Sequence, residues 1–146
     1  MNKIFLGVLF LVFFGLKNSV SGQKVNFHKN QEIAFVEVLK LAEKENKLIF
    51  MDVYTTWCGP CKLMDKTTFA DSAVGKVFNE KFINFKVNGE DAEGVSIVKK
   101  YRINAYPTFI FLDPKGELVN RLEGVFPSKL LIEESEYTMK LWKESR

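Results

Sequence analysis

Residues 48–64 read LIFMDVYTTWCGPCKLM, an apolar run followed by two cysteines that glycine and proline separate. The apolar run contains one acid, Asp52, and it predicts a buried strand over residues 48–54. The residues that follow predict a short turn and then a helix that begins near Cys58. Unpaired N–H groups and the positive end of the helix dipole favour a thiolate at such a position. We therefore expect Cys58 to be the attacking thiol.

The second cysteine, Cys61, lies one helical turn after Cys58, so that its sulfur returns to the same side within disulfide reach. Other uses of the pair fit the sequence less well. Zinc needs about four ligands, and the chain offers two cysteines and the distant His28. Haem attachment needs a histidine directly after the second cysteine, where Lys62 stands. A purely structural disulfide would close too short a loop to stabilise the fold much. We therefore interpret the pair as redox-active, with no metal and no bound cofactor.

The length of 146 residues allows one domain and hardly two. Residues 1–22 are typical of a secretory signal peptide, with a positive charge at Lys3, an apolar segment over residues 4–16 and small residues at 19–22. The apolar segment is shorter than the roughly 20 residues that span a bilayer, although an uncleaved anchor is the alternative. We expect residues 23–146 to form one exported domain, periplasmic or secreted, in a compartment where disulfides persist.

The charge of the mature chain is close to balanced. Removal of residues 1–22 takes away two lysines and no acid, which leaves 19 basic and 18 acidic residues. This balance gives no reason to expect nucleic acid or an anionic membrane as a partner. The only histidine, His28, is interpreted as a surface residue.

The remaining residues alternate between strand and helix patterns, in the order β, α, β, α in two pieces, β, α, β, β, α. Helical crossovers and a terminal hairpin predict an α/β fold with a mixed central sheet, helices on both faces and a closing helix. The predicted strands are a short edge strand within residues 23–30, then residues 48–54, 82–87, 107–113 and 117–122. The predicted helices are residues 31–44, a helix from Cys58 that pauses at residues 67–69 and resumes to residue 81, then residues 91–101 and 128–143.

Caps and apolar spacing give more specific expectations. Asn30 is predicted to cap the helix over residues 31–44 and Asn46 to end it, while Asp71 or Ser72 caps the resumed helix. On the helix over residues 91–101, the residues predicted to face the core are Val95, Val98 and Tyr101. On the helix over residues 128–143, they are Leu130, Tyr137 and Leu141.

The motif WCGPC after an apolar strand, with Tyr106-Pro107-Thr108 further on and Gly124 after the terminal hairpin, resembles the thioredoxin family. The resemblance covers about residues 24–142. The segment KTTFADSAV after the cysteine helix is similar to exported members, such as the C-terminal domain of the periplasmic disulfide interchange reductase. The resemblance implies a thioredoxin-like fold.

The resemblance also implies roles for single residues. Cys58 resembles the exposed nucleophile and Cys61 the buried resolving cysteine of a redox-active disulfide. Asp52 matches a buried acid whose pKa desolvation should raise, so that it exchanges a proton with Cys61. The alternative is a structural acid, satisfied by hydrogen bonds or kept ionised by Lys86. Pro107 resembles a cis-proline facing the cysteines, with a plain strand-entry proline as the alternative. The predicted substrate-binding residues are Trp57, Gly59, Pro60, Tyr106, Pro107 and Thr108, and the predicted supporting residues are Lys86 and Gly124.

The implied activity is that of a monomeric protein-disulfide oxidoreductase that acts through a mixed disulfide. The Gly-Pro pair between the cysteines resembles reducing members, so we expect disulfides of exported proteins as substrates and an upstream thiol as electron donor. No stable membrane insertion is expected after signal cleavage. The alternatives are a disulfide oxidase or isomerase, and a binding module or chaperone that uses the same fold without redox turnover.

Overall fold

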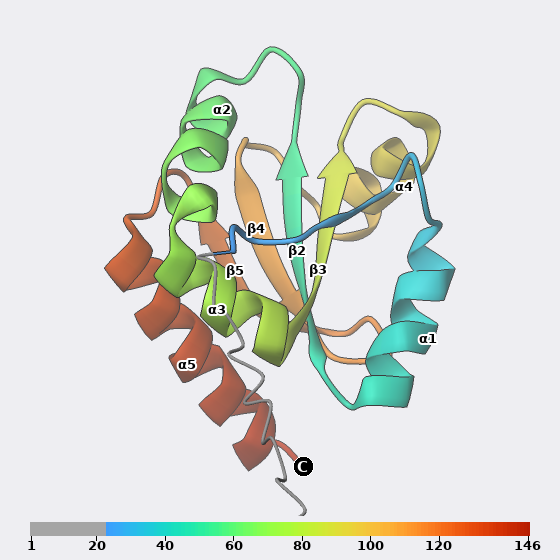
Figure 1. The fold of residues 1–146 in the computed structure, drawn as a ribbon. Helices are drawn as coiled ribbons and strands as arrows, with labels where there is room; N and C mark the ends of the chain where they lie inside the picture. Colours follow the sequence, from blue (N-terminus) through green and yellow to red (C-terminus); the bar gives the residue numbers. More distant parts are fainter. Residues whose placement is uncertain (1–22) are drawn as a thin grey trace, which may run out of the picture.

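The computed structural model describes residues 23–146, so the predicted signal peptide lies outside the described residues. Five strands form one mixed sheet with helices on both faces, which confirms the predicted α/β fold (Figure 1). The strands are β1 (His28–Lys29), β2 (Leu48–Tyr54), β3 (Phe82–Asn88), β4 (Thr108–Leu112) and β5 (Leu118–Glu123). The helices are α1 (Phe35–Glu45), α2 (Gly59–Lys66), the 3-10 turn η1 (Thr68–Ala70), α3 (Ser72–Lys81), α4 (Ala92–Lys100) and α5 (Ser128–Glu144).

The strand order β1-β3-β2-β4-β5 places β2 at the centre of the sheet. β2 runs parallel to β3, β3 runs parallel to β1, and β4 is antiparallel to both β2 and β5. The register pairs Tyr54 with Asn88 and Val53 with Thr108. The ends of β2 and β3 and the start of β4 therefore meet at one edge of the sheet, which is where the cysteines follow β2.

Side-chain alternation along β2 separates two cores. Ile49, Met51 and Val53 pack toward α1 and α4, whereas Leu48 and Phe50 pack toward α2, α3 and α5. Figure 1 shows the same division, with α2, α3 and α5 covering one face of the sheet. Continuing the alternation places Asp52 on the α2 face. On β3 the same rule places Lys86 there as well, because Phe85 and Val87 belong to the opposite core.

An aromatic cluster dominates the core on the α2 face. The fully buried ring of Phe50 has its centroid 4.7–6.1 Å from those of Phe69, Phe78, Phe109 and Phe111. Tilted and edge-to-face pairs of this kind contribute about 0.5–1.5 kcal/mol each beyond their buried area. This cluster lies on the face of the sheet that α2 covers, which is also the face of the site described in the next subsection.

One predicted cap is wrong. α1 begins at Phe35 after Ala34, which makes no side-chain cap, rather than at Asn30. The Asn30 amide instead donates to Asp91 Oδ1 at 2.6 Å and accepts from Asn88 N, so its polar groups join two loops. The predicted ends at Asn46, in a left-handed conformation, and at the N-cap Asp71 are confirmed.

The predicted buried side of α5 is also wrong. Leu130 is 42% exposed and Tyr137 is exposed, while the buried residues are Leu131, Ser135 and Thr138. The hydroxyls of Ser135 and Thr138 bond carbonyls of their own helix, so this side carries no unpaired hydroxyl toward the sheet. Apolar spacing could not reveal a buried side on which two of the three buried residues carry hydroxyls. Tyr101, the C-cap of α4, is buried as predicted, but Val95 on α4 is exposed.

No helix within residues 23–146 is both long enough and apolar enough to cross a membrane.

The corrected face of α5 gives a matched pair of substitutions. Leu131→Ala removes a fully buried side chain and is expected to lower the free energy of unfolding by about 2–5 kcal/mol. Leu130→Ala, one position away, should change it by no more than about 0.5 kcal/mol. Urea unfolding followed by circular dichroism measures both, and equal losses would contradict the assigned face.

Candidate functional site

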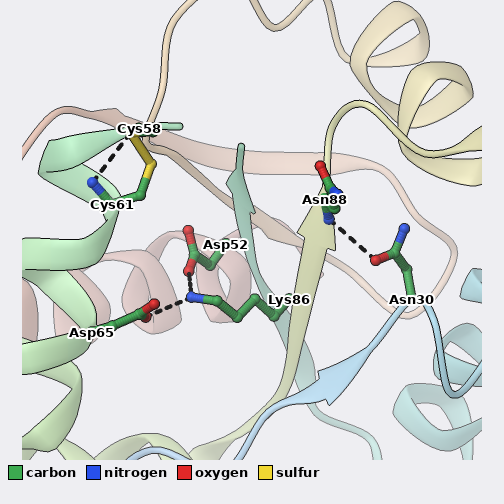
Figure 2. A network of polar contacts seen from close by, with 7 residues as sticks. All are labelled: Asn30, Asp52, Cys58, Cys61, Asp65, Lys86 and Asn88. Atoms are coloured by element: carbon green, nitrogen blue, oxygen red, sulfur yellow. Dashed lines mark hydrogen bonds and ion pairs between the residues drawn. A yellow bond between two sulfur atoms is a disulfide. The ribbon is translucent and has the colours of Figure 1, made fainter. Parts of the chain in front are cut away.

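The two cysteines form a disulfide directly after the central strand. Cys58 and Cys61 are bonded to each other, with 5.3 Å between their Cα atoms. Cys58 is the N-cap of α2, and its sulfur accepts a hydrogen bond from Cys61 N at 3.2 Å (Figure 2). Pro60 stands in the first helical turn, where its missing N–H group costs nothing. The sequence thus places both sulfurs at the positive end of a helix.

Both cysteines are buried in this oxidised state. Cys61 is 3% exposed, as predicted, but so is Cys58, which was expected to be exposed. The capping geometry explains the difference, because the Cys58 sulfur turns back over the first turn of α2 to accept the Cys61 N–H. The exposed neighbour is Trp57, at 66%.

A buried ion pair lies on the same face of the sheet as α2. Asp52 and Lys86 are register partners on β2 and β3, and Lys86 Nζ donates to Asp52 Oδ2 at 2.6 Å. The Asp52 side chain is 2% exposed and that of Lys86 is 12% exposed. Asp52 Oδ1 is buried without a hydrogen-bond partner among the described residues. Figure 2 shows this oxygen turned toward the side on which the disulfide lies.

Lys86 has a second acidic partner that the sequence analysis missed. Its Nζ also donates to Asp65 Oδ1 at 2.6 Å, and the Asp65 side chain is 46% exposed (Figure 2). The signal was present in the sequence, because Asp65 follows Cys61 by four residues and therefore lies on the same side of α2. The ammonium group is also surrounded by the rings of Phe27, Tyr54 and Phe69, whose centroids lie 4.9–5.5 Å away.

The pair shifts the titration of both partners. Burial raises the pKa of Asp52 above its ordinary value, and the attraction of Lys86 offsets only part of that rise. Burial acts to lower the pKa of Lys86, but the carboxylates of Asp52 and Asp65 outweigh it and raise that pKa. The predicted direction for Asp52 is confirmed, and Lys86 stays an ammonium group at neutral pH.

Two aromatic residues stand beside the disulfide. Trp57 Nε1 donates to Glu90 Oε1 at 2.8 Å, and its ring lies edge-on to that of Tyr106 with 6.0 Å between centroids. Glu90 was missed by the sequence analysis, since nothing local connects it with a residue 33 positions earlier. Its loop is held in place by Asn88, whose side chain accepts from Glu90 N and whose N–H donates to Asn30 Oδ1. Figure 2 shows this last bond on the flank of β3.

The remaining predicted residues gather at the same edge of the sheet. The peptide bond before Pro107 is cis, as predicted, and Pro107 O accepts from Gly124 N at 3.0 Å. Gly124 has a φ of 93°, a conformation that favours glycine. Thr108 begins β4 opposite Val53, and its hydroxyl donates to Ala105 O. Gly59 opens α2 with free space around it.

No group of three or more histidine, cysteine, aspartate or glutamate side chains suited to a metal ion occurs in the described part of the chain.

Comparison with known proteins places this geometry in context. The sequence matches the family described as "Thioredoxin-like domain" over residues 35–138. It is 34% identical over 104 residues to Thioredoxin Y, chloroplastic, of rice, which covers 71% of this chain and 58% of the rice protein. It is 32% identical over 77 residues to the thiol:disulfide interchange protein DsbD of Yersinia pestis, which covers 52% of this chain and 13% of that protein. The solution structure of a proposed disulphide-isomerase from Bacteroides thetaiotaomicron superposes with a TM-score of 0.70 and 42% identity, over 80% of this chain and 93% of that one.

The raised pKa of Asp52 predicts a pH-dependent gain in stability on substitution. A carboxyl with a raised pKa binds its proton more tightly in the folded protein, so stability falls as the pH rises above the ordinary value near 3.8. Asp52→Asn leaves Lys86 paired with Asp65, so no unpaired charge is created. The variant should therefore unfold at higher urea than the parent protein at pH 7, by on the order of 1 kcal/mol, and lose this advantage near pH 3. Glu133→Gln, which removes an exposed acid on α5, serves as the control. A less stable Asp52→Asn variant at pH 7 would contradict the assignment.

Proposed function

Because the chain belongs to the thioredoxin-like domain family, we propose that it is a thiol:disulfide oxidoreductase that reduces the disulfides of exported proteins. The observation that carries the proposal is the Cys58–Cys61 disulfide at the N-terminus of α2, above a buried acid with an unpartnered oxygen. A disulfide that spans two intervening residues constrains the chain little, so its presence is better explained by chemistry than by stability.

The proposed reaction passes two electrons from the cysteine pair to the substrate. The Cys58 thiolate attacks one sulfur of the substrate disulfide, and the other substrate sulfur leaves as a thiolate that takes a proton. Cys61 then gives its thiol proton to Asp52 and attacks the Cys58 sulfur. The second substrate sulfur leaves as a thiolate and takes a proton from solvent. The substrate is then a dithiol, and the protein holds the Cys58–Cys61 disulfide. An upstream thiol donor restores the reduced state.

Substrate contacts are proposed at the edge of the sheet where the disulfide lies. Trp57 and Tyr106 offer an aromatic surface that Glu90 steadies through the indole N–H. Gly59 and Pro60 lie beside the cysteines, and the Pro107–Thr108 segment faces them from the start of β4. Lys86 and Gly124 support the site, the former beneath Asp52 and the latter by bonding Pro107 O.

Export is proposed from residues 1–22 and from the likeness to DsbD. We propose that residues 1–22 are removed and that residues 23–146 act as a monomer without membrane insertion. The second candidate is disulfide isomerisation, which is favoured by the likeness to the Bacteroides structure. An isomerase would restore scrambled substrates better than it reduces insulin.

Serine variants of the cysteines test the mechanism. Cys58→Ser and Cys61→Ser should each lower insulin reduction with dithiothreitol to about 1% of the parent rate or less. Only Cys61→Ser should accumulate a mixed disulfide with insulin, detectable by mass spectrometry under non-reducing conditions. Full activity of Cys58→Ser would instead indicate a binding module.

The direction of electron flow is tested by the reduction potential. We expect equilibration with glutathione to give a potential nearer the roughly −270 mV of thioredoxin than the roughly −120 mV of strongly oxidising relatives. The measurement should be approached from both the oxidised and the reduced protein. A potential close to −120 mV would overturn the assignment as a reductase and favour an oxidase.

A further inference from the structure

A cavity on the flank of the molecule leads to the buried ion pair. It has a volume of about 450 Å³ and lies between the N-terminal segment, η1 and the side chain of Lys86. Its lining residues are Lys24, Val25, Asn26, Phe27, Lys29, Asp65, Phe69 and Lys86. Neither cysteine nor Trp57 belongs to this lining, so the cavity is separate from the surface proposed to receive the substrate.

Two hydrogen bonds connect the buried acid with this cavity, in a row of three side chains. Within residues 23–146, Asp52 Oδ1 has no hydrogen-bond partner, and it is turned toward the disulfide side, while Asp52 Oδ2 accepts from Lys86. Lys86 in turn donates to Asp65, and both residues line the cavity. Each of the two bonds in the row measures 2.6 Å. The half-exposed carboxylate of Asp65 therefore connects a nearly inaccessible acid with solvent.

We propose that the flank cavity is the port through which the proton of Cys61 reaches solvent while a protein substrate covers the front of the site. This inference rests on the proposed oxidoreductase function. The need for such a port follows from burial, because Cys61 and Asp52 are each at most 3% exposed even in the free protein. A docked substrate would cover Trp57 and close the front further.

The proposed transfer returns every group to its initial charge. The Cys61 thiol gives its proton to Asp52 Oδ1 as the Cys61 sulfur attacks Cys58. The protonated Asp52 carboxyl then rotates about its Cβ–Cγ bond so that the O–H faces Lys86 Nζ. Lys86 takes this proton as it gives one of its own to Asp65, and Asp65 releases that proton to solvent. One proton enters the row and one leaves it, and no neutral lysine has to persist. Asp65 is thus a positioning and relay residue, since it touches no reacting sulfur.

The charges around the row come from four elements and from the N-terminal segment. Asp52 lies on β2, Lys86 on β3 and Asp65 on α2, whereas Lys24 and Lys29 line the cavity from the N-terminal segment and β1. The aromatic side chains of η1 and the N-terminal segment contribute no titratable group. Asp65 is therefore the one acid of the cavity lining that can accept a proton from Lys86.

Asp65→Asn tests the port by comparing a large with a small substrate. Single turnovers of the reduced protein would be followed with insulin, by acid quench and mass spectrometry, and with 5,5′-dithiobis(2-nitrobenzoate), by absorbance. We expect a slowing on the order of tenfold with insulin and less than about twofold with the small disulfide, which leaves the front open to water. The solvent deuterium isotope effect should rise with insulin alone.

Two further variants complete the comparison. Asp65→Glu keeps a carboxylate and should restore the insulin rate, while Glu80→Gln removes an exposed charge at the far end of α3 and should leave both rates unchanged. Equal slowing of Asp65→Asn with both substrates would contradict the proposed port, because it would mean that Asp65 acts only through its charge on the cysteines. An unchanged insulin rate in Asp65→Asn would also contradict the proposed port. If the parent protein reduces neither substrate, the oxidoreductase function itself fails, which is a different result.

Discussion

The burial of Asp52 beside Lys86 is the constraint on which the rest of the site depends. Strand alternation sends both side chains to the α2 face, and the parallel register of β2 and β3 sets them directly opposite each other. An isolated carboxylate at this depth would be very unfavourable, so the ammonium group 2.6 Å away is what makes a charged acid possible there. The packing of α2 then brings Cys61 and Asp65 to the same pair.

The sequence predicted correctly those features that depend on neighbouring residues, namely the bounds of a strand and a helix and two helix ends. The strand Leu48–Tyr54 and the helix after Cys58 have the expected bounds because an apolar run, a turn and a Pro in the first helical turn leave few alternatives. The cap at Asp71 and the left-handed end at Asn46 follow from the chemistry of their own side chains. The family motif added the cis-proline, which strand patterns alone could not provide.

The missed features all depend on contacts between distant segments. Asn30 has the side chain of a helix cap, but its partners are the end of β3 and the loop after β3, 58 and 61 residues later. Glu90 reaches Trp57 only because β2 and β3 end at the same edge of the sheet. Asp65 is the intermediate case. Its spacing of four residues from Cys61 predicts that it lies on the same side of the helix, but its partner Lys86 was identified only through the family resemblance. Sequence patterns therefore predicted the cysteines and the acid, and the register of the sheet determined what surrounds them.

The two faces of the sheet differ in a way that packing alone does not require. The core toward α1 and α4 is made of apolar side chains and the buried Tyr101, whereas the α2 face carries a row of charged groups beside a phenylalanine-rich apolar core. A neutral side chain at position 52 would be buried at lower cost, and β2 would keep its ladder with either neighbour. The charged side chain of Asp52 is best explained by the disulfide chemistry proposed for the neighbouring cysteines. Formation of the disulfide needs an acceptor for one proton beneath Cys61, and an acid whose pKa is raised by burial holds that proton more readily than an exposed one. The same burial that strengthens the acceptor also isolates it, so the row through Lys86 to the flank follows from the same physical requirement as the acid itself.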